Sequence, residues 1–265
     1  MKSLIKKILK KDRRIFLRRV FYAGTKYNCS VCNSNLRSML TSGYQLPVLS
    51  ELDVIGGETI PYDTCPVCFA NSRTRLLLEY IQREIKIDKA SSRFRLLHVA
   101  PEYGIYSRLK VNENIDYVAV DLNPIEYRDI EGVSRCDVTA IDFANDSFDL
   151  IICSHVLEHV PQDHVAIKEL FRVLKSGGTA ILQVPISASL QMTIEDPNLT
   201  DPRERERRFG QHDHVRIYGA DYPTRLRNGG FSVEVFDATS HWDAAIVEKL
   251  RLNPRERIFV GKKTE

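Results

Sequence analysis

Four cysteines form two CxxC pairs, the residue pattern with the most definite chemistry in this chain. Cys29 pairs with Cys32, and Cys65 with Cys68, with 32 residues between the two pairs. Each pair can present two sulfur atoms to one ion from a tight turn, and four thiolates complete the tetrahedral coordination of zinc. Closing a longer loop adds little entropic cost. The pattern predicts a structural Zn²⁺ site; the alternatives are a redox-active CxxC and four metal-free thiols.

Polar residues follow three apolar runs. Asp121 ends the run 117–121, Asp137 follows 133–136, and His155 follows 148–153. In an open parallel sheet, ligands bind beyond the carboxyl ends of the strands. A carboxylate at the end of the second strand can accept hydrogen bonds from both hydroxyls of a ribose. A carboxylate at the end of the third strand can accept a hydrogen bond from an adenine amino group. The two aspartates therefore predict a nucleotide-type site.

Histidine is the side chain best suited to take a proton near neutral pH. His155 lies at a strand end, while His212 and His214 lie in a long connection over residues 185–218. Long connections often cover functional sites. We therefore predict His155, His212 and His214 as catalytic residues, with packing of the connection as the alternative for the last two. Glu158 and His159 are expected to be structural.

Apolar runs alternate with helical patterns over the last two-thirds of the chain. The expected strands are 95–100, 117–121, 133–136, 148–153, 179–184, 231–236 and 257–260. The expected helices between them include 105–110, 162–174 and 218–228. Such alternation predicts an α/β fold with a mostly parallel, seven-stranded sheet and helices on both faces.

Composition and charge divide the chain into three parts. Its 265 residues are 43% hydrophobic and 28% charged, which is enough to build a packed core. The first 20 residues carry nine Lys or Arg and one Asp, so the rest of the chain has a net charge of −5. We expect a basic amphipathic helix at 1–22, a zinc-ribbon-like module at 23–75 and an α/β domain at 76–265.

The basic N-terminal segment is the feature that bears on location. A helix over residues 2–20 is expected to contact an anionic membrane surface or a partner, or alternatively to pack on the body of the protein. No apolar run reaches the ~18–20 residues needed to span a bilayer, and no secretory signal is apparent. A cytoplasmic protein, peripheral at the inner face of the membrane, is expected. The acidic remainder makes nucleic acid a less favoured partner.

Several motifs carry a resemblance to a known family. The segment from Phe94 to Lys262 resembles the class I S-adenosylmethionine (SAM)-dependent methyltransferases, in particular the methyltransferase-11-like group. The matching strings are SFDLIICSHVLEHV at 147–160, ELFRVLKSGGT at 169–179 and QVP at 183–185. CPVC-x3-SRTRLL near 65–78, VAPEYG at 99–104 and FGQHDHVRIYGADY at 209–222 are similar to a bacterial subgroup with N-terminal cysteine pairs.

The resemblance implies a Rossmann-like fold and SAM as cofactor. It places Asp121 at the ribose hydroxyls, Leu122 against the adenine, and Asp137 with Val138 at the adenine edge. The full set implied to bind the cofactor is Ala100, Pro101, Glu102, Gly104, Asp121, Leu122, Asn123, Asp137, Val138 and Ser154. One departure concerns the first loop, which in the family usually reads GxGxG and here has a single glycine, Gly104.

The function implied is methyl transfer to a small molecule or a carbohydrate, such as a bacterial surface glycan or its lipid-linked precursor, at an oxygen atom. One alternative is an RNA methyltransferase whose zinc module contacts phosphates. The net negative body and the absence of a (D/N)PPY-type motif, whose place is taken by Cys153-Ser154-His155, count against it. Another alternative is a non-catalytic scaffold that keeps the fold, supported by the departure in the first loop.

Overall fold

A seven-stranded sheet forms the centre of the protein in this computed structural model, which describes residues 13–87 and 93–264. The strand order is β14-β15-β10-β9-β6-β7-β8, and only β15 runs antiparallel to its neighbours. The strands are β6 (Phe94–Val99), β7 (Ile115–Asp121), β8 (Ser134–Arg135), β9 (Phe148–Ser154), β10 (Leu174–Gln183), β14 (Ser232–Phe236) and β15 (Ile258–Lys262). The order reverses between β6 and β9, which is where such sheets bind ligands.

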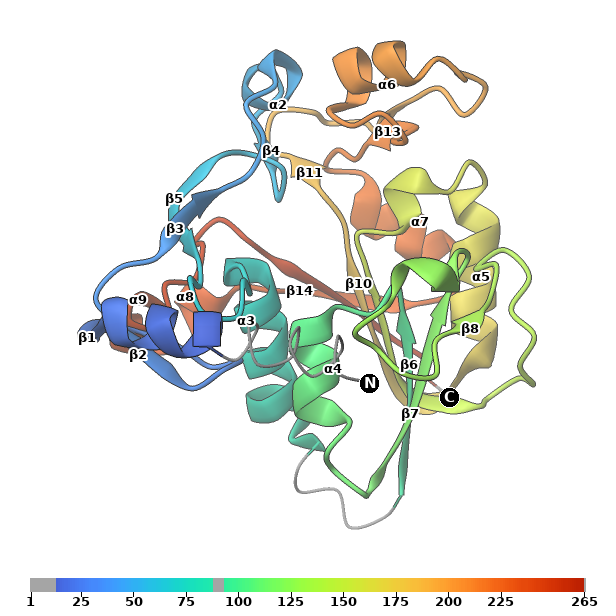
Figure 1. The fold of residues 1–265 in the computed structure, drawn as a ribbon. Coiled ribbons are helices and arrows are strands. Elements are labelled where there is room, and N and C mark those ends of the chain that lie inside the picture. Colours follow the sequence, from blue (N-terminus) through green and yellow to red (C-terminus); the bar gives the residue numbers. More distant parts are fainter. Residues whose placement is uncertain (1–12, 88–92, 265) are drawn as a thin grey trace.

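Both faces of the sheet are buried, because each central strand is apolar on both sides. In the register of β6 on β9, Leu96 lies opposite Leu150 and Leu97 lies opposite Ile151. Leu96 and Leu150 belong to one core cluster, whereas Leu97 and Ile151 belong to another. Helices cover each face (Figure 1). They are α3 (Ser72–Tyr80) and α4 (Tyr103–Leu109) on the first face, and α5 (Asp163–Val173) and α7 (Tyr222–Asn228) on the second.

The N-terminal part is a module of short elements that packs against the first face. A helix over residues 13–21 precedes β1 (Ala23–Cys29), β2 (Ser34–Leu36), β3 (Leu40–Ser42), α2 (Pro47–Glu51), β4 (Val54–Ile55) and β5 (Ile60–Thr64). Most of its buried side chains share one core with the sheet, whereas Leu49 and Val54 pack with Phe209 and Ile217. Arg75 of α3, which is fully buried, donates hydrogen bonds to the carbonyls of Asp63, Ala70, Leu250 and Arg251. Arg75 thereby ties the module to the C-terminal part of the chain.

A second set of short elements lies above the carboxyl ends of the strands. The connection after β10 holds β11 (Ile186–Ser187), β12 (Ile194–Glu195), α6 (Pro202–Phe209) and β13 (Arg216–Ile217). β11 pairs with β4 of the module, and β12 pairs with β13. Figure 1 shows α2, β4, β11, α6 and β13 together at one end of the sheet. The module and this connection thus cover the ligand end from two sides.

The remaining short elements complete the chain. They are the helical turns η1 (Ile81–Ile85), η3 (Pro124–Glu126) and η4 (Leu157–His159), and the helices α8 (Ala238–His241) and α9 (Ala244–Lys249).

The predicted fold class is confirmed: all seven expected strands are present, with boundaries shifted by a few residues. Residues 203–208, whose sequence RERERR mixes basic and acidic side chains, lie in α6. Of the expected basic helix at 2–20, residues 13–20 are helical, and residues 1–12 lie outside the described part of the chain. Among the described residues, no helix has both the length and the apolar character needed to cross a membrane.

Candidate functional site

The four predicted zinc ligands lie together. The sulfur atoms of Cys29 and Cys68 are 3.5 Å apart, and those of Cys32 and Cys65 are 3.7 Å apart. Zinc–sulfur bonds of about 2.3 Å in a tetrahedron place sulfur atoms about 3.8 Å from one another. A disulfide would require about 2.05 Å. The four sulfur atoms therefore fit the tetrahedral coordination of one zinc ion, and they leave no coordination position open for a substrate.

Two matching backbone turns orient these cysteines. The amide of Asn33 donates to the carbonyl of Cys29 at 2.7 Å, and the amide of Phe69 donates to that of Cys65 at 2.9 Å. Asn33 and Phe69 both have left-handed backbones, with φ of 55° and 63°. The amide of Val67 also points at the Cys65 sulfur, at 3.4 Å. Such amide–sulfur contacts support metal-bound thiolates.

The loop after β6 keeps a glycine-like backbone although its first residue is alanine. Ala100 has a φ of 50°, a conformation that costs an L-residue roughly 1–2 kcal/mol. Gly104 is required by packing: a Cβ there would lie 2.9 Å from Thr74 Cγ2 and 3.3 Å from Val31 Cγ1. The single glycine therefore serves the close approach of α4 to α3 and to the turn of the first cysteine pair.

Glu102 occupies the space between this loop and the end of β9. Its two oxygens accept hydrogen bonds from Ser154 Oγ at 3.1 Å and Thr74 Oγ1 at 2.6 Å, and Arg73 Nε lies 3.6 Å away. Burial raises the pKa of Glu102, but Arg73 and Thr74 outweigh it and bring that pKa below its usual range. The loop therefore presents a fixed negative charge at the switch point.

The two predicted strand-end aspartates are held by their own loops. Asp121 accepts from the Asn123 amide at 2.6 Å and from the Tyr127 hydroxyl at 2.8 Å. Asp137 accepts from the Thr139 amide at 2.8 Å and hydroxyl at 2.7 Å, which lowers the pKa of Asp137. A carboxylate has about four acceptor positions. Each aspartate therefore keeps acceptor capacity for a ligand.

The surroundings of these aspartates are partly open. A cavity of about 290 Å³ lies at the ends of β7 and β8, with Val120, Asp137 and Phe143 among its lining residues. Leu122 is 60% exposed, so an aromatic ligand could cover it. Val138 is buried.

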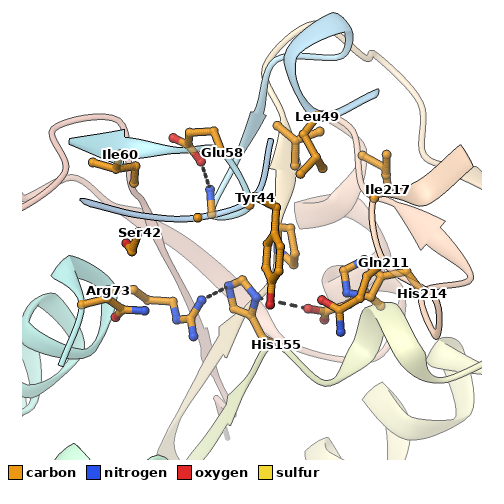
Figure 2. A pocket seen from close by; sticks show the side chains of 18 of the residues that line it. Ser42, Tyr44, Leu49, Glu58, Ile60, Arg73, His155, Gln211, His214 and Ile217 are labelled. Carbon is orange, nitrogen blue, oxygen red and sulfur yellow. Dashed lines mark hydrogen bonds and ion pairs between the residues drawn. The ribbon is translucent and has the colours of Figure 1, made fainter. Parts of the chain in front are cut away.

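A larger polar pocket of about 580 Å³ lies at the carboxyl end of β9. The module contributes one wall, the connection after β10 contributes another, and His155 lies on the floor (Figure 2). The module residues include Ser42, Tyr44, Gly56, Glu58 and Arg73, and the connection provides Phe209, Gln211, His214, Arg216 and Ile217.

His155 is positioned by a strained backbone and two polar partners. Its φ is 56°, an uncommon conformation of the kind that recurs at functional sites. Arg73 Nη1 lies 2.9 Å from Nε2, and Glu158 Oε1 lies 3.3 Å from Nδ1. Because Arg73 can only donate, Nε2 accepts and Nδ1 carries the hydrogen. Burial, reinforced by Arg73, lowers the pKa of His155, so the ring is neutral at pH 7.

The other two predicted catalytic histidines differ in position. His214 is 8% exposed, lines the pocket, and has Nδ1 3.2 Å from the carbonyl of Phe209. Burial lowers the pKa of His214 to about 4. The side chain of His212 is 70% exposed and is not among the residues that line the pocket. The structure therefore brings His155 and His214 together and leaves His212 outside.

Several pocket residues had no signal in the sequence. Tyr44 and Glu58 lie in the turn-rich module, and their pocket position arises only because β4 pairs with β11. Arg73 follows the second cysteine pair by a few residues and reads as an ordinary helix position.

Arg216 lines the pocket, but its guanidinium is turned to the protein interior. It is 1% exposed, donates to the carbonyls of Leu157, Val160 and Pro161, and pairs with Glu195. The guanidinium therefore stabilises the η4 turn and the residues after it by satisfying these carbonyls.

Comparisons with known proteins identify the central region. Residues 97–182 match the family model Methyltransf_11, described as a methyltransferase domain. An uncharacterized methyltransferase of Mycolicibacterium vanbaalenii is 29% identical over 99 residues, covering 34% of this chain and 39% of the relative. An uncharacterized protein of Methanocaldococcus jannaschii is 28% identical over 121 residues, covering 45% of this chain and 53% of the relative.

A solved structure extends the likeness to the fold. The crystal structure of the CurJ carbon methyltransferase matches 72% of this chain and 54% of its own, with a TM-score of 0.50 and 15% identity. The class I SAM-dependent methyltransferase resemblance and the Rossmann-like fold are thus confirmed. The chain spans about half or less of the length of the curated relatives that it matches.

Proposed function

We propose that this chain, which contains a class I methyltransferase domain, transfers a methyl group from SAM to a hydroxyl of a small polar acceptor, with carbohydrates the first class to test. The observation that carries the proposal is the position of His155. It lies on the floor of a polar pocket, at the end of β9 and next to the switch point of the sheet.

The residues around the switch point fit SAM in their chemistry. Asp121 and Asp137 retain acceptor capacity for the ribose and adenine. Glu102, held ionised beside Ser154, would bind the ammonium of the methionine part. Ala100 and Pro101 would border that part, and Leu122, Asn123 and Val138 the nucleoside. SAM supplies a methyl group on a positively charged sulfur.

His155 would take the proton of the acceptor. Its Nε2 is the ring atom with the lone pair, so Arg73 must yield that position to the acceptor hydroxyl. With SAM bound, the acceptor oxygen would take the methyl carbon, and the sulfur would leave with the electron pair of the broken carbon–sulfur bond. The hydroxyl proton passes to His155. The rest of the pocket contributes by holding oxygen and methyl in line.

The lining of the pocket supports an acceptor rich in hydroxyl groups. Ser42, Tyr44 and Glu58 present oxygens from the module, and Tyr44 points toward the pocket floor (Figure 2). Glu256 lines the same pocket, and burial raises the pKa of Glu256 to about 7, so its carboxyl donates as well as accepts near neutrality. Hydroxyl groups of a sugar can satisfy both kinds of partner.

Calorimetric titration with S-adenosylhomocysteine, the reaction product, tests the cofactor site. We expect micromolar binding by the wild type and a loss of at least about tenfold for Asp121→Ala, since a hydrogen bond to a charged group is worth ~1.5–3 kcal/mol. Asp116→Ala is the matched control, because Asp116 lies at the other end of β7 and pairs with Arg95. A folded, zinc-loaded wild type that binds no S-adenosylhomocysteine would contradict the proposal and favour a scaffold.

Two roles outside the pocket complete the proposal. The cysteine cluster would hold a structural Zn²⁺ that fixes the module and hence one pocket wall. The helix over residues 13–21 would lie on an anionic membrane surface. Its exposed side chains Phe16, Leu17, Val20 and Phe21 form an apolar group beside the exposed Arg13, Arg14 and Arg19.

The double variant Phe16→Ser/Val20→Ser should bind vesicles of phosphatidylserine and phosphatidylcholine roughly tenfold more weakly than the wild type. Burying an exposed apolar side chain of this size contributes ~1.5–3 kcal/mol, only part of which is realised in a shallow interface. Co-sedimentation measures the effect. Val111→Ser, which removes an equally exposed apolar side chain elsewhere, should not change binding. Equal loss in both variants would argue against this surface.

A further inference from the structure

Three side chains on the pocket floor form a second group with metal-ligand chemistry. Glu158 and His159 come from η4, and His214 comes from the loop before β13. One ligand atom from each lies within 4.8 Å of the others, and all three residues line the 580 Å³ pocket. The group is separate from the cysteine cluster, which belongs to the module.

Glu158 lacks the compensation that a buried carboxylate needs. It is 1% exposed, and within the described part of the chain the neutral Nδ1–H of His155, 3.3 Å from Oε1, is the one polar side-chain group beside its two oxygens that the hydrogen bonds and ion pairs show. An isolated buried carboxylate is costly, and a bound cation would remove that cost.

Each of the two histidines is held by a hydrogen bond at Nδ1. Nδ1 of His159 lies 3.1 Å from Asp213 Oδ2, and Nδ1 of His214 lies 3.2 Å from the carbonyl of Phe209. Both partners are acceptors, so both Nδ1 atoms carry the hydrogen and Nε2 keeps the lone pair. A carboxylate or carbonyl on the outer nitrogen is how metal-binding histidines are usually oriented.

We propose that Glu158, His159 and His214 bind one divalent transition-metal ion, of the Zn²⁺, Mn²⁺ or Fe²⁺ class, on the floor of the acceptor pocket. Two imidazoles and one carboxylate with open positions are a recurring donor set for such ions. Bonds of about 2.1 Å hold donor atoms roughly 3–4 Å apart. Donor atoms at the 4.8 Å limit would therefore have to approach one another by about 1 Å, which side-chain rotation can supply.

The role of the ion rests on the proposed function, whereas its binding does not. An acceptor hydroxyl on an open position of the ion would have a lower pKa and release its proton more readily. That proton would pass to His155, which adjoins Glu158. This arrangement selects acceptors whose hydroxyl is flanked by a second oxygen, such as vicinal diols, because two neighbouring oxygens can occupy two open positions.

Manganese titration of the zinc-loaded full chain, without SAM or acceptor, tests the site. Mn²⁺ is the probe because thiolates disfavour it. Electron paramagnetic resonance of free Mn²⁺ should report one site per chain in the wild type. Glu158→Gln and His214→Ala should weaken binding by at least tenfold, and Asp213→Asn, which alters the orienting partner of His159 and no proposed ligand, by about 10–100-fold. His164→Ala, an exposed histidine on α5, should bind like the wild type.

S-adenosylhomocysteine binding by each variant serves as the test of folding. Absence of any site beyond the cysteine cluster in a wild type that binds S-adenosylhomocysteine, whether probed with Mn²⁺ or Zn²⁺, would overturn the proposal. Unchanged affinity in Glu158→Gln and His214→Ala would also overturn it. Manganese binding in a chain that fails to bind S-adenosylhomocysteine would uphold the metal site and refute the proposed function.

Discussion

Cys65→Ser should leave the chain without zinc and largely unfolded at 37 °C. Cys65 is fully buried, and it belongs to the same core as Leu96 and Leu150 of the sheet. Structural zinc in small domains contributes roughly 10–16 kcal/mol, which is comparable to the whole ~5–15 kcal/mol net stability of a typical domain. Since one core joins module and sheet, loss of the ion should spread beyond the module.

Metal analysis and thermal unfolding followed by circular dichroism measure this effect. The wild type should carry one tightly held zinc per chain, and chelator treatment should lower its unfolding midpoint. Cys136→Ser is the matched control, because Cys136 is a half-buried cysteine outside the cluster. It should keep both zinc and midpoint. Full zinc content and an unchanged midpoint in Cys65→Ser would refute a structural ion.

The sheet was predictable because its signals are local. The apolar runs around Leu96, Val118 and Ile151 are short, bounded by turn residues and separated by helical periods, which is what a doubly wound sheet requires. The cysteine pairs were equally readable, since their spacing alone defines the turns. Neither prediction depended on contacts between distant segments.

The acceptor pocket could not be predicted in the same way. Its module wall reaches the sheet through the pairing of Val54 and Ile55 with the connection after β10, a contact between segments more than 130 residues apart. Glu158 and His159 read as structural residues for the same reason, because the loop that brings His214 beside them follows 55 residues later. Contacts between distant segments also decide which histidine of the connection reaches the pocket: His212 is exposed, whereas His214 is buried.

His155→Asn should lower kcat by about 10²–10⁴-fold, the usual contribution of a positioned general base. Asparagine is the informative replacement because His155 has a φ of 56°, and asparagine tolerates this left-handed backbone better than most residues. The substitution therefore removes the ring without forcing the end of β9 to move. The rate is measured with the acceptor that a panel of sugars identifies.

The two possible roles of His155, general base or structural residue, lead to different expectations for ligand binding and stability. If His155 acts as the base, His155→Asn should keep the unfolding midpoint and the S-adenosylhomocysteine affinity of the wild type while kcat falls. If the side chain serves only to hold Glu158 and Arg73, the asparagine should instead weaken ligand binding and stability together, because those partners lie 3.3 Å and 2.9 Å away.

His155→Val provides the contrast. A β-branched residue is strained at this φ, so this variant should lose stability as well as rate. A kcat for His155→Asn within about threefold of the wild type, far below the ~10²-fold minimum for a base, would exclude proton transfer to His155.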